Sequence, residues 1–198
     1  QDSFINDNTG GGFNQTIDTE LTTWSLTPRA NLDWMLNGRD HQSIVGVDFY
    51  YADYDSDRSR NRNEAPVHRY LAHQTTFGLY GQDDFKLSDV LTAQVGGRFI
   101  WNKFSGGDEF NPNAPGANGF VGKRETTGAV NGYYLYNIGL EYKIAQNLAV
   151  FGRTGRSIRL PTIDERIGSS DGSTFKLKTQ ISGDVEVGYR YQTKKLAL

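Results

Sequence analysis

The feature of this sequence that most limits its fold is a period-two alternation of apolar and polar residues over long segments. From Leu91 to Trp101, one set of alternate positions reads Leu, Ala, Val, Gly, Phe, Trp and the other reads Thr, Gln, Gly, Arg, Ile. Successive side chains of a β-strand point to opposite faces, so this pattern predicts strands with one apolar and one polar face. It recurs at 45–51, 134–144 and 184–191, whereas helical periodicity is hard to find.

The pattern predicts seven strands, joined alternately by short and long connections. Pro28 inside the first strand predicts an irregularity there. The short connections lie near 37–41, 86–90 and 145–147, and each of the others spans 15 residues or more. In an antiparallel meander this rhythm gathers the short turns at one end and the long loops at the other, as in outer-membrane barrels. The predicted strands cover 22–36, 42–54, 70–86, 90–104, 131–145, 148–158 and 183–193.

Strand length and aromatic placement favour a membrane barrel over a soluble sandwich. The predicted strands run to roughly 11–15 residues, against 5–6 in typical soluble proteins and about 9–11 for crossing a bilayer. Trp24, Trp34, Tyr51 and Trp101 lie near strand ends, where aromatic girdles form at membrane interfaces. A soluble antiparallel sheet also has one wet face. A soluble all-β binding module and a passive porin or adhesin-type barrel therefore stay open as alternatives.

Composition argues against several kinds of site. With 21 basic and 23 acidic residues the net charge is −2, which is no signature of nucleic-acid binding. The chain has no cysteine, and its three histidines do not have metal-ligand spacing. The alternating aspartates of 53–59 lack the Gly and closing Glu of a calcium loop. Asp164 and Glu165 are adjacent, so on an extended chain they cannot flank one bond as an acid/base pair. We predict no enzyme, and thus no catalytic residue, cofactor or metal site.

Three segments carry motifs that resemble those of TonB-dependent outer-membrane receptors. Residues 73–104 resemble the strand–turn–strand pattern YxQDxxxLxxxLTxxxGxR, here with Tyr80, Gln82 and Asp83 at its start. Residues 136–165 end in GRSIRLPTIDE, which resembles the element GFRxPxxxE of that family. Residues 177–191 resemble LKPExSxxxExGxRY, with Thr-Gln in place of Pro-Glu. Order and spacing together make the resemblance fairly specific over roughly 73–191.

The resemblance implies an antiparallel up-and-down transmembrane β-barrel, typically of about 22 strands, with a separate plug domain in its lumen. We expect residues 1–198 to form part of one such barrel domain, with no plug domain present. The expected location is the bacterial outer membrane, and the expected function is import of an iron–siderophore complex or related metal chelate. The expected partners are outer-membrane lipid, the chelate, and TonB only through a segment absent from this chain.

The resemblance also implies that extracellular loops capture the ligand. For the basic run 58–62, the alternative to ligand contact is a solvated loop or contact with lipopolysaccharide. For the charged stretch 152–168 we favour a structural interpretation, in which its arginines and Glu165 pair with one another or with neighbouring strands. The candidate ligand-contact residues are Arg58, Arg60, Arg62, Tyr70, Phe110, Phe120, Arg124, Arg156 and Arg159.

Overall fold

A computed structural model describes residues 3–5, 15–120, 122–123, 126–167 and 176–192. Within these residues one antiparallel sheet follows chain order, and β3 pairs with β4 in line with β2. A 3-10 turn, η1 (Ala117–Gly119), and one short helix, α1 (Ile163–Ile167), complete the fold. The strands are β1 (Ser3–Ile5), β2 (Gln15–Leu26), β3 (Arg29–Leu36), β4 (Arg39–Ser59), β5 (His68–Lys86), β6 (Leu91–Phe110), β7 (Thr127–Ala145), β8 (Leu148–Arg159) and β9 (Gln180–Tyr191).

The all-β meander and the seven predicted strands are confirmed, with the first strand divided into β2 and β3. The division falls at Pro28, which has no N–H to donate, although its carbonyl accepts the Val47 N–H at 3.0 Å. The pairing with β4 keeps one register across the break. β4 and β6 extend five and six residues beyond their predicted ends, to Ser59 and Phe110. The sequence prediction missed β1 and α1.

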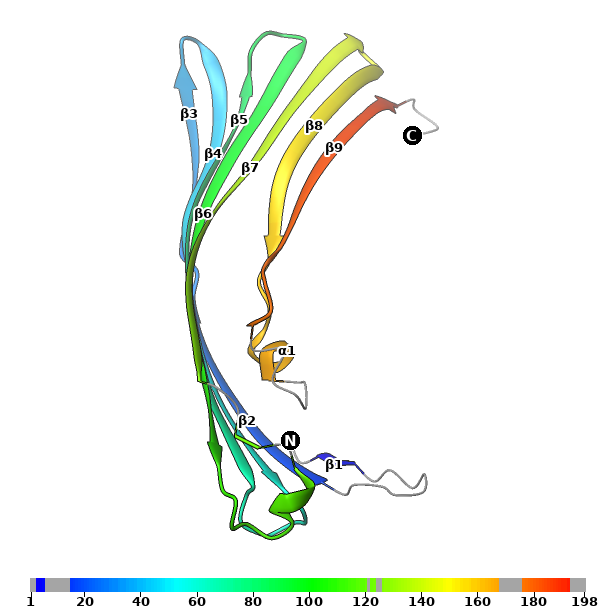
Figure 1. The fold of residues 1–198 in the computed structure, drawn as a ribbon. Coiled ribbons are helices and arrows are strands. Elements are labelled where there is room, and N and C mark those ends of the chain that lie inside the picture. Colours follow the sequence, from blue (N-terminus) through cyan, green and yellow to red (C-terminus); the bar gives the residue numbers. More distant parts are fainter. Residues whose placement is uncertain (1–2, 6–14, 121, 124–125, 168–175, 193–198) are drawn as a thin grey trace.

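The sheet bends into a trough, with the three short turns at one end and the longer connections at the other (Figure 1). Helix α1 lies on the concave side, near the loop end (Figure 1). Its isoleucines pack against the wall, so they identify which alternate positions face inward. No helix among the described residues has the length and apolar character needed to cross a membrane. The inward-facing residues in this contact are Tyr54, Tyr70, Ala72 and Phe104.

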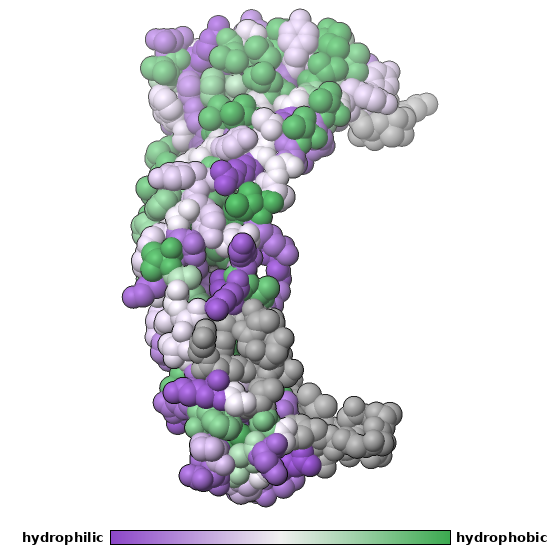
Figure 2. All heavy atoms as spheres, viewed as in Figure 1, coloured by the Kyte–Doolittle hydropathy of each residue, from purple (hydrophilic) through white to green (hydrophobic). Residues whose placement is uncertain are grey.

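The convex face is apolar in the half of the sheet near the short turns. Val185 and Val187 are 79% and 81% exposed there, and Tyr134 is 72% exposed. Apolar side chains gather toward that end in the space-filling view (Figure 2). Such side chains are left without protein partners on this face, as expected for a wall that faces lipid.

The polarity of the two faces reverses along β4. On β4, the convex positions from Val45 to Tyr51 are Val, Val, Phe and Tyr, and the next three are Asp53, Asp55 and Asp57. The concave positions change in the opposite sense, from buried Asp48 to the aromatic core around α1. The apolar layer therefore passes from the outside of the wall to its inside.

Candidate functional site

An ion pair lies flat on the concave face near mid-wall. Arg98 Nη2 donates to Asp48 Oδ2 at 2.5 Å, and the Arg98 guanidinium lies 5.3 Å from the Tyr80 ring centroid. Asp48 is buried. Two glycines leave space for the side chains of Tyr80 and Arg98. A Cβ at Gly46 would collide with Tyr80, and one at Gly78 would lie 3.2 Å from Arg98 Nη2. Arg98 of β6 and Asp48 of β4 therefore pair across the intervening strand β5.

Two further ion pairs cross β7, β8 and β9 on the same face. Arg153 Nε lies 2.5 Å from Glu186 Oε2, and Arg190 Nη1 lies 2.6 Å from Glu141 Oε2. Both arginine side chains are exposed, so each pair contributes at most about 1 kcal/mol to stability. Their main effect is on the character of the surface: the concave side here carries ion pairs, and the convex side carries apolar residues.

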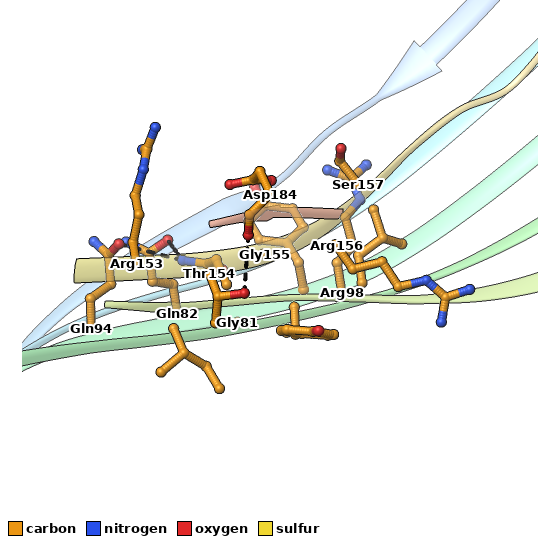
Figure 3. A pocket seen from close by; sticks show the side chains of 16 residues that line it. Gly81, Gln82, Gln94, Arg98, Arg153, Thr154, Gly155, Arg156, Ser157 and Asp184 are labelled. Carbon is orange, nitrogen blue, oxygen red and sulfur yellow. Dashed lines mark hydrogen bonds between the residues drawn. The ribbon is translucent and has the colours of Figure 1, made fainter. Parts of the chain in front are cut away.

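An amide cluster adjoins the first ion pair. Asn137 Nδ2 donates to Gln82 Oε1 and to Gln94 Oε1, each at 3.4 Å, and it lies directly over Gly96. Figure 3 shows the recess that these side chains share with the arginines of β6 and β8. We call this the polar recess; its inward-facing polar residues include Gln82, Gln94, Arg98, Asn137, Arg153 and Asp184. It offers donors and acceptors but no nucleophile paired with a base.

The end of β8 is tied to α1 by a capping box. The Thr162 N–H donates to Glu165 Oε2 at 3.0 Å, and the Glu165 N–H donates to Thr162 Oγ1 at 3.3 Å. Arg159 also donates to Glu165. These hydrogen bonds, that from Arg159 first, lower the pKa of the Glu165 carboxyl below its ordinary value. The structural pairing predicted for Arg159 and Glu165 is confirmed.

Helix α1 docks on the inner wall three strands away from the strand that precedes it. Ile163 and Ile167, one helical turn apart, enter the cluster of Tyr54, Tyr70, Ala72 and Phe104. The guanidinium of Arg166 lies 4.4 Å from the Phe104 ring centroid, and burial lowers the pKa of Arg166. The β8–β9 connection therefore crosses the concave face and rests on β4, β5 and β6.

A buried histidine–aspartate pair lies next to this core. His68 Nδ1 is 2.9 Å from Asp108 Oδ1, and both side chains are buried. The rings of Tyr70, Phe110 and Phe120 surround His68 at centroid distances of 5.5, 5.0 and 5.8 Å. Beyond it, residues of the β4–β5 and β6–β7 connections form a small cluster of their own: Val67, Ala114 and Ala117, with Phe110 and Phe120 against them.

The candidate ligand-contact residues fall into different environments. Arg58 is buried, donates to the Ile167 carbonyl at 3.2 Å and covers the Tyr70 ring, and Tyr70 itself is fully buried. Phe110 and Phe120 are half-buried against His68. Four of the nine residues therefore support the packing of loops and α1 on the wall.

The other candidates are more accessible. Arg60 is half-buried and contacts Gly116 of the β6–β7 connection, and Arg62 is exposed in the β4–β5 connection. Arg159 is exposed and bound to Glu165. Arg156 pairs with Tyr136 and Gly183 in the ladder, which places it on the convex side, opposite Ser157 (Figure 3). Arg124 lies outside the described residues.

Sequence reasoning missed the polar recess and the buried pair. The alternation places Gln82, Gln94 and Asn137 on one face, but it does not say which strands are neighbours in register. His68 and Asp108 are 40 positions apart and meet only through the β5–β6 ladder. Among the described residues, no group of three or more His, Asp or Glu side chains could hold a metal ion.

Comparison with known proteins shows which protein family this sheet belongs to. The family profile "TonB dependent receptor-like, beta-barrel" matches residues 1–198. The chain belongs to this family. TonB-dependent receptors reside in the bacterial outer membrane, and they are transporters rather than enzymes. The convex apolar face is therefore the lipid-facing side, and the concave face lines the lumen. A search of curated protein sequences found no match.

Solved structures of transporters and receptors share the fold at low sequence identity. The ferric citrate transporter FecA in the unliganded form matches with a TM-score of 0.67 and 12% identity, over 96% of this chain and 27% of its own. The copper transporter OprC matches with 0.66 and 15%, over 99% and 32%. The Serratia marcescens hemophore receptor HasR matches with 0.55 and 22%, over 92% and 31%. The chain thus spans about a third of the length of these receptors.

Proposed function

We propose that this chain forms part of the barrel of a receptor that imports a metal chelate, of the iron–siderophore class, across the outer membrane. The family match over all 198 residues is the observation that carries the proposal. The three related structures are named for ferric citrate, copper and a heme-bearing hemophore, so their common cargo is a metal or a metal complex. TonB would engage a part of the receptor outside these residues.

The lumen side supports this function. Three of its ion pairs and its bonded amides give a polar surface along which a hydrated, charged complex can move. The loop end adds Arg62 and Arg159 as accessible cations for an anionic chelate. We propose these two residues, with Arg60, as ligand contacts at the extracellular mouth.

Uptake by cells that carry the intact receptor gene tests the function. Cells with the gene, and matched cells without it, are given radioactive iron bound to citrate, a catecholate or a hydroxamate, and in parallel copper or heme. We expect gene-dependent and TonB-dependent accumulation of one ferric chelate. Accumulation that depends on the gene but not on TonB would show a passive pore. Uptake of copper or heme alone would replace the iron cargo.

The Arg62→Gln and Arg159→Gln variants test the mouth. Each is expected to raise the chelate concentration needed for half-maximal binding by about tenfold, as for loss of one charge-assisted hydrogen bond. Arg153→Gln, whose arginine is also exposed and ion-paired but lies deeper on the wall, is the matched control. Equal effects from all three variants would contradict a binding site at the mouth.

A further inference from the structure

The transport function does not use a polar cluster on the convex face, at the short-turn end of β3, β4 and β5. Trp34 Nε1 donates to Ser43 Oγ at 2.8 Å, and Ser43 Oγ donates to Asp83 Oδ1 at 2.6 Å. His41 Nδ1 lies 2.7 Å from Asp83 Oδ2. In the register Trp34 pairs with His41, and His41 pairs with Phe85, so all five side chains share one face. We call them the rim cluster.

The rim cluster holds His41 in one orientation. Its ring lies between Trp34, at 4.3 Å between centroids, and Phe85, at 5.2 Å, and its side chain is only 10% exposed. A carboxylate only accepts hydrogen bonds, so His41 Nδ1 carries the proton toward Asp83.

The position of the cluster decides what it meets. It lies on the lipid-facing side, and its neighbours on that face are Leu32, Leu36, Ala93 and Val95. An aspartate and a histidine would be costly in hydrocarbon, whereas Trp is typical of the interface. Short turns of outer-membrane barrels face the periplasm. The cluster therefore lies at the headgroup level of the periplasmic leaflet.

We propose that the rim cluster binds the headgroup of an aminophospholipid in that leaflet. The primary ammonium group of the lipid donates to the Asp83 carboxylate, whose side chain is 27% exposed. Arg39, two positions before His41 on the same face, takes the phosphodiester. The exposed leucines of β3 lie beside the acyl chains. This inference depends on the outer-membrane location and is independent of the cargo.

Lipid retention by the intact receptor tests the site. The purified protein is exchanged into nanodiscs of equal parts phosphatidylethanolamine, phosphatidylcholine and phosphatidylglycerol, and the lipids retained after mild detergent extraction are counted by native mass spectrometry. We expect preferential retention of phosphatidylethanolamine, since only its headgroup has an ammonium with N–H donors. Equal retention of the three lipids would overturn the proposal. Inorganic phosphate is expected to give no thermal stabilisation, and stabilisation equal to that by the lipid would show a phosphate site only.

Matched variants test whether the preference for phosphatidylethanolamine arises at the rim cluster. Asp83→Asn is expected to reduce phosphatidylethanolamine retention about tenfold, by loss of a charge-assisted hydrogen bond. His73→Gln is the control, because His73 is also a convex-face histidine on β5 with an aspartate partner, Asp53 at 2.8 Å, but lies toward the loop end. If Asp83→Asn fails to assemble, Arg39→Gln at the turn is expected to lower retention of all three phospholipids. Unchanged retention in both variants would contradict the site.

Discussion

The half of the wall near the short turns and the half near the long loops are built from the same strands with opposite polarity. In the turn half, exposed Val, Leu and Tyr cover the convex face, and ion pairs such as Arg98–Asp48 lie on the concave face. In the loop half, Asp53, Asp55 and Asp57 are convex, and the aromatic cluster under α1 is concave. The change on β4 falls between Tyr51 and Asp53.

In a soluble protein a second layer of helices or strands would cover the apolar face of the sheet. The difference between the two halves shows what covers that face here. A single sheet must cover its apolar face, and lipid covers it in the turn half. Beyond the membrane the outside is water, so the apolar residues move inward and α1 covers them. We therefore expect the outer boundary of the membrane on this wall to lie between Tyr51 and Asp53. Four predictions test that boundary and the two kinds of cover.

The largest effect is expected from Phe104→Ala. Phe104 is fully buried beneath α1, so the variant should lower the free energy of unfolding of the receptor in lipid by about 3–5 kcal/mol. Phe99→Ala on the convex face of the same strand is the comparison. Phe99→Ala should lower the free energy of unfolding by clearly less, because lipid tails can fill the space that the phenyl ring leaves and are as apolar as that ring. Denaturant titration measures both, and equal losses would show that α1 does not cover a core.

Val187→Arg should have the next largest effect. Val187 lies on the lipid-facing side of β9, and a cation at the middle of the membrane costs about 2–4 kcal/mol of folding free energy. The matched variant Glu20→Arg also places a cation on the convex face, but on β2 beyond Trp24. It should change stability by no more than about 0.5 kcal/mol. A large loss for Glu20→Arg would move the membrane boundary outward.

Thr162→Ala removes the hydroxyl of the capping box. The loss of a cap typically costs about 1 kcal/mol, and it should act on the docking of α1 rather than on the sheet. Hydrogen–deuterium exchange of the peptide that contains 160–167 should become faster, while exchange of β6 stays unchanged. Thr154→Ala is the control, since its hydroxyl donates to a backbone carbonyl within the ladder. Faster exchange throughout the sheet would contradict a local role for the cap.

The smallest effect is expected from acid. The pKa of Glu165 is lowered in the folded protein, so its contribution to α1 docking is fully present above the ordinary carboxyl value of 4.5 and is lost as pH falls below it. The hydrogen–deuterium exchange rate of 160–167, corrected for the intrinsic pH dependence of exchange, should therefore increase as the pH is lowered below 4.5. Glu165→Gln should abolish this acid-dependent rise. A rise that persists in Glu165→Gln would assign it to another group.

The sequence alone determined the strands, their faces and their order. Period-two alternation placed seven strands, Pro28 indicated the break between β2 and β3, and short connections indicated the turn end. Motifs in 73–191 were sufficient to suggest the family. This information is local: it depends on which side of a strand each residue occupies and on which residues permit a turn.

Only the tertiary structure decided what the polar residues contact. Helix α1 was not predicted because five helical residues between strands carry too little periodicity, and most of its stability comes from docking on β4–β6. The sequence predicted Arg58 and Tyr70 as accessible ligand-contact residues, yet both are buried beneath that helix. The pairs His68–Asp108 and His41–Asp83 join residues about 40 positions apart. Alternation fixes the face of a side chain, but the register between strands and the covering of each face fix its partner.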